Sequence, residues 1–284
     1  MKKMITAAVC ALASSLGLAE TVTLSPIADA TLFDGLDQNN AHGAGPHVFV
    51  GVTRDAYARR ALVQFDLSQI PGNAVISGAS LTLTVTRHLI GEPLVTVHRL
   101  TSEWGEGPTN AGEPGGQGAP ALAGDATWVF RFFGTDNSWN NPGGDFEGAP
   151  SAQTVVTGFG TFTWSGPGLV ADVQAWVSGN EPNFGWLLRG GEDSTFNAKQ
   201  FGSRENADPA VRPVLVVEYT VAPACEPDVT QDGNVDQDDI FCLAQVVAGD
   251  PSCSSLDPDF NRDGNVDQDD IDALAQVVAG QPCP

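Results

Sequence analysis

A stretch of 22 residues occurs twice near the C-terminus, and this repeat constrains the fold more than any other feature of the chain. The first copy, residues 228–249, reads DVTQDGNVDQDDIFCLAQVVAG, and the second, residues 259–280, reads DFNRDGNVDQDDIDALAQVVAG. The copies begin 31 residues apart (259 − 228), and the core GNVDQDDI is identical in both. Self-similarity at a fixed offset predicts that one structural unit is built twice.

Each copy opens with the spacing of a calcium-binding loop. Ca²⁺ takes about 6–8 oxygen ligands, which alternate positions of a tight loop supply, and glycine at position 6 permits the sharp turn. Gly233 and Gly264 stand at that position. An acidic, solvated tail has no reason to repeat this spacing with glycine in register. The expected ligands are Asp228, Thr230, Asp232, Asn234, Asp236 and Asp239 in the first loop, and Asp259, Asn261, Asp263, Asn265, Asp267 and Asp270 in the second.

A helix is predicted after each loop but not before it. In residues 240–247 and 271–278, apolar side chains recur at i, i+3, i+4 and i+7, which indicates an amphipathic helix. Gly249 and Gly280 follow where a helix commonly ends. Proline stands directly before position 1 of both loops and again further upstream, which leaves no room for the entering helix of an EF-hand.

Two calcium loops with exit helices but no entering helices resemble a type I dockerin over residues 225–284. The resemblance implies a small all-α module that needs Ca²⁺ to fold and docks onto a cohesin-like protein. In dockerins, loop positions 10 and 11 help to select the cohesin. Small hydroxyl residues are usual at these positions in the cellulosomal type. Here the positions hold Gln237, Asp238, Gln268 and Asp269, so the resemblance does not identify the particular cohesin.

Four of the five cysteines lie in the same C-terminal region, and four cysteines allow three pairings. Because Cys225 and Cys283 bracket the repeats, we favour a Cys225–Cys283 clasp and a local Cys242–Cys253 bridge. Disulfides and Ca²⁺ would offset the small core that a module of this size can bury. A zinc site is the weaker alternative, since no CxxC pair and no histidine lies nearby.

The N-terminus predicts export. Residues 1–19 combine a basic start, an apolar stretch and a small-x-small ending, the pattern of a secretory signal peptide. No later stretch has 18 uninterrupted apolar residues, so no membrane span is expected. We therefore expect a secreted, extracellular protein, with association at a cell surface as a further option.

The charge of the chain disfavours nucleic acid as a partner. The formal net charge is −22. Residues 223–284 hold 14 acidic residues against Arg262 alone, a net of −13, and residues 20–222 hold 21 acidic and 10 basic residues, a net of −11. Neither region has the basic excess that attracts a phosphate backbone.

Residues 20–222 predict a single mainly β domain, an antiparallel, jelly-roll-like β-sandwich. Short runs rich in β-branched and apolar residues alternate with Gly, Pro, Asn and Asp. One helix is expected near 169–178 and a long loop at 103–125. Strands are expected at 21–25, 29–33, 47–52, 58–67, 79–87, 94–101, 126–133, 153–157, 160–164, 184–189, 197–203 and 212–220.

This region also resembles a known family. The segments DATLFDG (29–35), RRALVQFDLSQIP (59–71), VHRLTSEWGEG (97–107), DVQAWVSGNEPNFGWLL (172–188) and FGSRENADPAVRPVLVVEY (201–219) are similar, in this order, to the DNRLRE domain family. That family is grouped with carbohydrate-binding modules, and some members bind alginate. The resemblance implies a β-sandwich and binding of a polysaccharide.

Candidate glycan-binding residues follow from chemistry. Sugars stack on exposed aromatic rings, and an acidic glycan needs cations. Trp104 and Trp139 stand among loop residues and are the better aromatic candidates, unless their rings plug the sandwich instead. Arg59, Lys199 and Arg204 are the candidate cations, although Arg204 beside Glu205 also fits a structural ion pair. Asp29, Asp34 and Asp37 form a candidate structural calcium site.

No enzymatic site is expected. The sandwich region contains no GxSxG or HExxH motif and no cysteine nucleophile. Neighbouring carboxylates occur in its loops, but in a chain this acidic such neighbours arise by chance. We interpret the chain as a non-catalytic polysaccharide-binding protein that attaches through its dockerin-like module to a cohesin-bearing partner or surface scaffold. The alternatives are a structural surface protein without glycan binding and a polysaccharide lyase or glycosidase with an unrecognised site.

Overall fold

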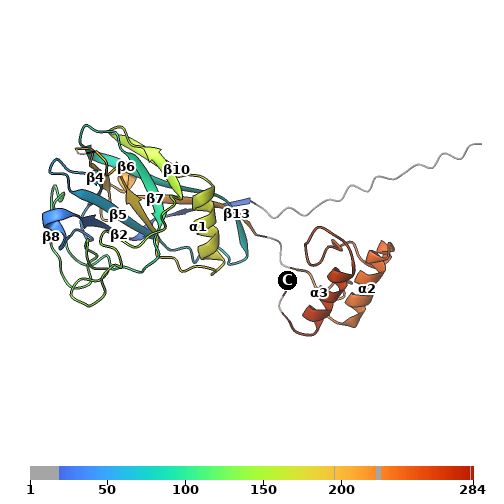
Figure 1. Cartoon of the computed structure of the whole chain (residues 1–284). Helices are drawn as coiled ribbons and strands as arrows, with labels where there is room; N and C mark the ends of the chain where they lie inside the picture. Colours follow the sequence, from blue (N-terminus) through green and yellow to red (C-terminus); the bar gives the residue numbers. More distant parts are fainter. Residues whose placement is uncertain (1–18, 195, 222–224, 282) are drawn as a thin grey trace, which may run out of the picture. The chain divides into compact units, whose positions relative to one another are not determined.

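The computed structural model describes residues 19–194, 196–221, 225–281 and 283–284. These residues form two compact units, Ala19–Val221 and a C-terminal unit that extends to Pro284 (Figure 1). The predicted signal peptide lies outside the described residues except for Ala19, with which the first strand begins. Among the described residues, no helix is long and apolar enough to span a bilayer.

The first unit is mainly antiparallel β-structure, as predicted. Eleven strands form one continuous curled sheet along the path β1-β13-β6-β12-β4-β5-β11-β7-β9, with β10 beside β6 and β2 beside β5. A second pair, β3–β8, is separate. The strands are β1 Ala19–Leu24, β2 Pro26–Phe33, β3 Asn40–Ala41, β4 His47–Val52, β5 Ala58–Phe65, β6 Ala74–His88, β7 Leu94–Arg99, β8 Ala119–Pro120, β9 Ala152–Val155, β10 Gly160–Ser165, β11 Trp186–Arg189, β12 Lys199–Gly202 and β13 Val214–Val221.

Strand β4 joins the two halves of this sheet. Its first residues, His47–Val50, pair with β12, and its last two, Gly51 and Val52, pair with β5. Apolar side chains from both halves pack into one core, which holds Leu81, Phe201 and Leu215 from one half and Val63, Val97 and Leu188 from the other. The curled sheet thus encloses its own apolar face.

In strand β6, the alternation of apolar and polar residues predicts most of the strand but not its beginning. Leu81, Leu83 and Val85 are buried while their neighbours are partly exposed, as the period of two requires. The strand begins five residues before the predicted start at residue 79. A register shift opposite Glu218 and Tyr219 interrupts the alternation there, and such a bulge breaks the sequence pattern without ending the strand.

Helix α1, Pro167–Val177, covers one end of the curled sheet in Figure 1. It corresponds to the helix predicted near residues 169–178. Leu169, Val173 and Trp176 form its buried face. Gln174 ties the helix to the start of β6, because its side chain accepts a hydrogen bond from the Ile76 N–H (2.9 Å) and donates one to the Ala74 carbonyl (3.0 Å).

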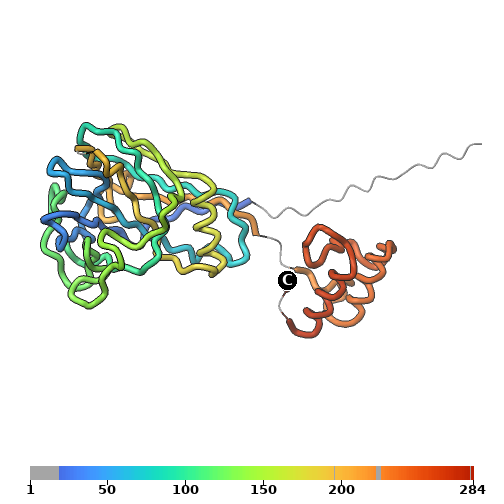
Figure 2. The backbone as a smooth tube through the Cα atoms, viewed as in Figure 1, coloured from blue at the N-terminus to red at the C-terminus, as the bar shows by residue number. Residues whose placement is uncertain are grey.

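The strand predicted at 126–133 is wrong. That segment forms turns within a long irregular region between β7 and β9, which gathers on the side of β8 in Figure 2. The Thr127 hydroxyl accepts hydrogen bonds from the N–H groups of Val129 and Phe130, and the Thr127 N–H bonds the Phe130 carbonyl. These local bonds compete with strand pairing, although the side chains of the segment suit a strand.

The C-terminal unit contains two helices of equal length, α2 Gln237–Val247 and α3 Gln268–Val278, as the repeat predicts. Asp236 and Asp267 cap them, each in a capping box with the Asp three residues later. Gly249 and Gly280, with φ of 97° and 91°, follow the last turns. Leu243, Leu274, Val229 and Phe260 are buried between the two repeats.

Two disulfides close this unit, Cys225–Cys283 and Cys242–Cys253, the pairing favoured from the sequence. They join residues separated by 58 and 11 positions respectively. A disulfide stabilises mainly by reducing the conformational freedom of the unfolded chain, and this effect grows with the length of the closed loop.

We therefore expect the long clasp to contribute more than the local bridge. Replacing Cys225 and Cys283 by alanine should lower the free energy of unfolding by roughly 4 kcal/mol, and replacing Cys242 and Cys253 by roughly 3 kcal/mol. Urea denaturation followed by helical circular dichroism, at one fixed calcium concentration, measures both. A larger loss from the Cys242/Cys253 pair would contradict the loop-entropy argument.

Candidate functional site

The two tryptophans predicted to stack on sugars are buried, and the expectation that they face solvent is wrong. Trp104 is 8% exposed and Trp139 is 3% exposed. Their indole N–H groups donate to the carbonyls of Phe184 (2.9 Å) and Thr127 (2.8 Å). Both rings pack on the outer face of the sheet against Leu32, Leu62 and Leu187. The two tryptophans lie in the irregular region between β7 and β9, and through them this region packs on that face.

Two of the predicted cations are also buried. Arg59 is 2% exposed, and its guanidinium donates to the Asp37 carboxylate (2.8 Å) and the Gly116 carbonyl (3.2 Å). The ammonium group of Lys199, which is 0% exposed, donates to the carbonyls of Leu89 (2.9 Å) and Gly91. Burial lowers the pKa of both groups. Arg59 and Lys199 are therefore not free surface cations, because their polar atoms bond to loops of the protein, and their predicted contact with a glycan stays a prediction.

The same two side chains nevertheless line a surface pocket of about 170 Å³ at the ends of β4, β6 and β12. Arg87 of β6 is the exposed cation of this pocket, and within the described residues its side chain forms no hydrogen bond or ion pair. His88 is half-buried beside it. The full lining is Phe49, Thr53, Arg59, Arg87, His88, Leu89, Pro114, Gly116, Ala198, Lys199 and Gln200.

Phe159 is an exposed aromatic ring that does not line the pocket itself but contacts His88, which does. It is 70% exposed in the turn between β9 and β10, and its ring meets the His88 ring edge-on with centroids 4.7 Å apart. A ring left in solvent is available for stacking. Sequence reasoning missed Phe159 and Arg87 because it searched for tryptophan, although a phenylalanine between Gly158 and Gly160 in a tight turn has little to pack against locally.

Arg204, the third predicted cation, belongs to an acidic cluster at another place in the first unit. Its guanidinium pairs with both oxygens of Glu106 and with Glu205 (2.8 Å), and its backbone N–H donates to Asp29 Oδ2 (2.7 Å). The bond to Glu106 raises the pKa of Arg204 further. Arg204 and Glu205 thus form the ion pair that was the structural alternative for Arg204. Glu106 and Asp29 also bond to Arg204.

Burial changes the pKa of two of these carboxyl groups. Asp29 is 1% exposed, and burial raises its pKa well above the usual value, against the lowering effect of the Arg204 N–H. Burial also raises the pKa of Glu205, and the neighbouring Glu106 charge adds to this. Of the three residues proposed from sequence for a structural calcium, only Asp29 lies here, because Asp34 caps a 3-10 turn and Asp37 pairs with Arg59.

In the first C-terminal loop, two of the acidic residues predicted as calcium ligands accept hydrogen bonds from the backbone of the loop. Asp228 accepts hydrogen bonds from the N–H groups of Asp232 (3.0 Å) and Gly233 (2.9 Å), so the chain folds around its carboxylate. Gly233 has a φ of 93°. Asp239, from the start of α2, is 1% exposed and accepts from Thr230 and Asp236. Positions 1 and 12 of the loop are therefore both directed inward.

The second loop repeats most of these contacts, but the Asp263 N–H donates to Asn261 Oδ1 (2.9 Å) instead of to the position 1 carboxylate. Asp259 accepts from Gly264 N–H (3.0 Å), and Asp270 accepts from the N–H groups of Asn261 and Asp267. Within the described residues, Asp259 Oδ1 is buried and has no hydrogen-bond partner. An orphaned buried carboxylate oxygen beside the acidic Asp263, Asp267 and Asp270 of the same loop fits a hard cation such as Ca²⁺, although within the described residues no three carboxylates of the loop meet within 4.8 Å of one another.

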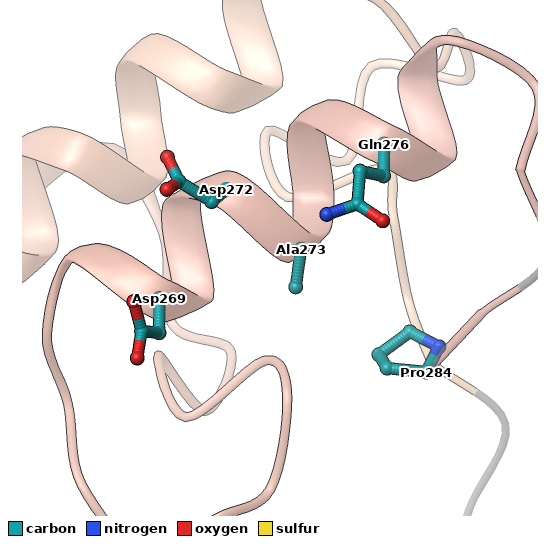
Figure 3. A pocket seen from close by; sticks show the side chains of 5 residues that line it. All are labelled: Asp269, Asp272, Ala273, Gln276 and Pro284. Carbon is teal, nitrogen blue, oxygen red and sulfur yellow. The ribbon is translucent and has the colours of Figure 1, made fainter.

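The predicted partner-selecting residues lie on the surface. Gln237, Asp238, Gln268 and Asp269 are all exposed at the first turns of α2 and α3. Asp269 also lines a surface pocket of about 360 Å³ with Asp272, Ala273, Gln276 and Pro284 (Figure 3). On α2 the residue equivalent to Asp272 is Phe241, which is 60% exposed, so the two copies present different chemistry at this position.

Comparison with known families gives one match. Residues 20–111 match the family model of carbohydrate-binding module family 96. The match covers 92 residues (111 − 20 + 1), less than half of the chain, and does not extend to the C-terminal unit. It supports a domain like a carbohydrate-binding module, although under a different name from the DNRLRE resemblance. No curated protein matches the chain.

The burial of Trp104 leads to a prediction. Trp104→Phe should lower the free energy of unfolding by about 1–3 kcal/mol, because the Phe184 carbonyl loses its donor. The affinity of the folded protein for a polysaccharide should not change. Urea denaturation and affinity electrophoresis measure the two effects separately. A loss of affinity in a fully folded variant would restore a binding role for this ring.

Proposed function

We propose that this protein is a secreted, non-catalytic polysaccharide-binding protein that attaches to a partner through a calcium-dependent module. The observation that carries the first part is the match to a carbohydrate-binding module family over residues 20–111. Arg87, His88 and Phe159 supply a candidate surface for the sugar. The two disulfides are compatible with an extracellular protein.

The chemistry of the pocket favours a glycan that carries acidic groups. Arg87 is exposed, and its guanidinium can pair with a carboxylate or sulfate through two parallel hydrogen bonds. Phe159 offers a ring face nearby, next to His88. Arg59 and Lys199 lie behind this surface and add positive charge, although their donors are used within the protein. The unit as a whole is acidic, so binding depends on this local group of cations.

We predict that Arg87→Gln and Phe159→Ala each weaken binding to an acidic polysaccharide, by about tenfold or more for Arg87→Gln, since loss of a charged hydrogen bond costs about 1.5–3 kcal/mol. Affinity electrophoresis against neutral and acidic polysaccharides measures the change. Added salt should lower the affinity of the wild-type protein for the acidic polysaccharide more than it lowers the affinity of Arg87→Gln.

The matched control is Arg131→Gln, which removes the same charge from a residue of the irregular region that does not line the pocket. It should bind like the wild type. If the protein binds no polysaccharide at all, the alternative of a structural surface protein is favoured. Release of reducing ends or unsaturated products would instead favour the third alternative, a glycosidase or lyase.

The proposal for the C-terminal unit is docking onto a cohesin-like protein. It is supported by the backbone hydrogen bonds to the carboxylates of positions 1 and 12 in both loops, by the buried and unpartnered Asp259 Oδ1, and by the exposure of Gln237, Asp238, Gln268 and Asp269 at the first turns of the two helices. Bound Ca²⁺ would be held by the twelve loop residues predicted from sequence. It would also reduce the net charge of −13 on this region, which otherwise opposes folding.

We predict that Ca²⁺ increases the helix content of the isolated residues 223–284 cooperatively, and that Asp228→Ala/Asp259→Ala abolishes the response, because each change removes the position 1 ligand. Circular dichroism during calcium titration measures this. Glu226→Ala, which removes an exposed carboxylate outside both loops, is the control. An unchanged spectrum at all calcium concentrations would refute the calcium loops and remove the basis for docking.

A further inference from the structure

Three carboxylates from distant parts of the sequence meet in the first unit, outside the glycan pocket and the C-terminal loops. They are Asp29 on β2, Glu106 in the irregular region after β7, and Glu205 in the turn after β12. Each offers an oxygen, and these oxygens all lie within 4.8 Å of one another. We propose that Asp29, Glu106 and Glu205 form a binding site for Ca²⁺.

Two buried oxygens without partners support a ligand at this place. Asp29 accepts a hydrogen bond through Oδ2 only, and within the described residues Oδ1 has no partner although the side chain is 99% buried. Glu205 Oε2 is likewise buried and unpartnered. Buried polar atoms are almost always satisfied, so two orphaned carboxylate oxygens in one cluster indicate a missing cation.

The charges of the cluster leave room for a divalent ion. The three carboxylates carry −3 when ionised, and Arg204 contributes +1, which leaves −2. Arg204 is committed to Glu106 through both of its oxygens, and this pair leaves Asp29 Oδ1 and Glu205 Oε2 unneutralised. A single divalent cation would balance the remainder and would give a partner to the two buried oxygens that lack one, Asp29 Oδ1 and Glu205 Oε2, whose burial without a partner is costly.

The surrounding backbone fixes the three side chains. The Asp29 N–H donates to Glu106 Oε1 (2.8 Å), and the Ser203 hydroxyl accepts from the Glu205 N–H (3.1 Å) while donating to the Gly45 carbonyl. Gly43 lies so close to the Glu106 carbonyl that a Cβ there would be 1.8 Å from it. The site is therefore positioned before any ion binds, which lowers the cost of binding.

The donor set selects a hard cation. All three groups offer oxygen, and the cluster contains no histidine or cysteine, the ligands that favour zinc. The side chains of Glu106 and Glu205 are 17% and 22% exposed, which leaves a path for the ion and space for water ligands. Ca²⁺ accepts such irregular coordination, whereas Mg²⁺ demands a regular octahedron. A bound ion would link β2 to two segments far away in the sequence.

The placement of tryptophan allows a direct test with terbium ions, which substitute for Ca²⁺ and emit after energy transfer from a nearby indole. All six tryptophans lie between residues 104 and 186, and neither tryptophan nor tyrosine occurs after residue 219. Trp104 is two residues from Glu106. The full mature chain would carry Asp228→Asn and Asp259→Asn, so that the C-terminal loops do not contribute.

We expect tryptophan-sensitised terbium emission that Ca²⁺ displaces. Glu205→Gln should weaken terbium binding by about tenfold or more, since it removes one of three charged ligands. Glu103→Gln, a neighbouring exposed carboxylate outside the cluster, is the matched control and should bind as before. Ca²⁺ should also raise the Tm of the parent protein but not that of Glu205→Gln, whose fold is checked by circular dichroism.

Absence of sensitised emission would overturn the site, as would equal effects of Glu205→Gln and Glu103→Gln, which would indicate only general attraction of cations to an acidic surface. Asp29→Asn, which keeps the side-chain shape, is a second variant and should also abolish the calcium-dependent rise in Tm. The result is independent of the docking proposal, because the C-terminal loops are disabled in every protein tested.

Discussion

The corner in β4 is the constraint on which the first unit depends. Within six residues this strand passes from pairing with β12 to pairing with β5, and the two halves of the sheet can face each other only because of it. Gly51 stands at the change, with a φ of 109°, and a Cβ there would lie 2.7 Å from Asn197 Oδ1. That oxygen instead accepts a hydrogen bond from Val52 N–H at 2.7 Å, which fixes the strand as it turns.

The candidate glycan pocket is a consequence of this corner. Phe49 and Thr53 come from β4 and the residues after it, while Arg87 and Lys199 come from the strand ends that the corner brings alongside. The ammonium group of Lys199 donates to carbonyls of the turn after β6. This cation, which the sequence suggested as a ligand contact, therefore positions a wall of the pocket. Arg87, which lies on β6, is exposed. Neighbouring cations thus have different roles, decided by burial.

This difference sets the limit on what the sequence could predict. Alternation identified most strands, because a half-buried strand must repeat with period two. Alternation does not say whether a loop folds back over the outside of a sheet. Trp104 and Trp139 stand in segments rich in glycine and polar residues, which suggested exposed rings, yet those segments cover the outer face of β2, β5 and β11. Burial of such residues depends on contacts between segments, and a single sequence does not contain them.

The two classes of proposed calcium site illustrate the same point. In the C-terminal loops all ligands fall within twelve residues, so their spacing is visible in the sequence and the glycine marks the turn. In the first unit, Asp29, Glu106 and Glu205 are separated by 77 and 99 positions (106 − 29 and 205 − 106), and only the curled sheet brings them together. Folding must precede the formation of that site, whereas in the loops the ion and the local fold can form together. An ion at the first site would therefore stabilise a structure that already exists, and an ion at the loops would help to create one.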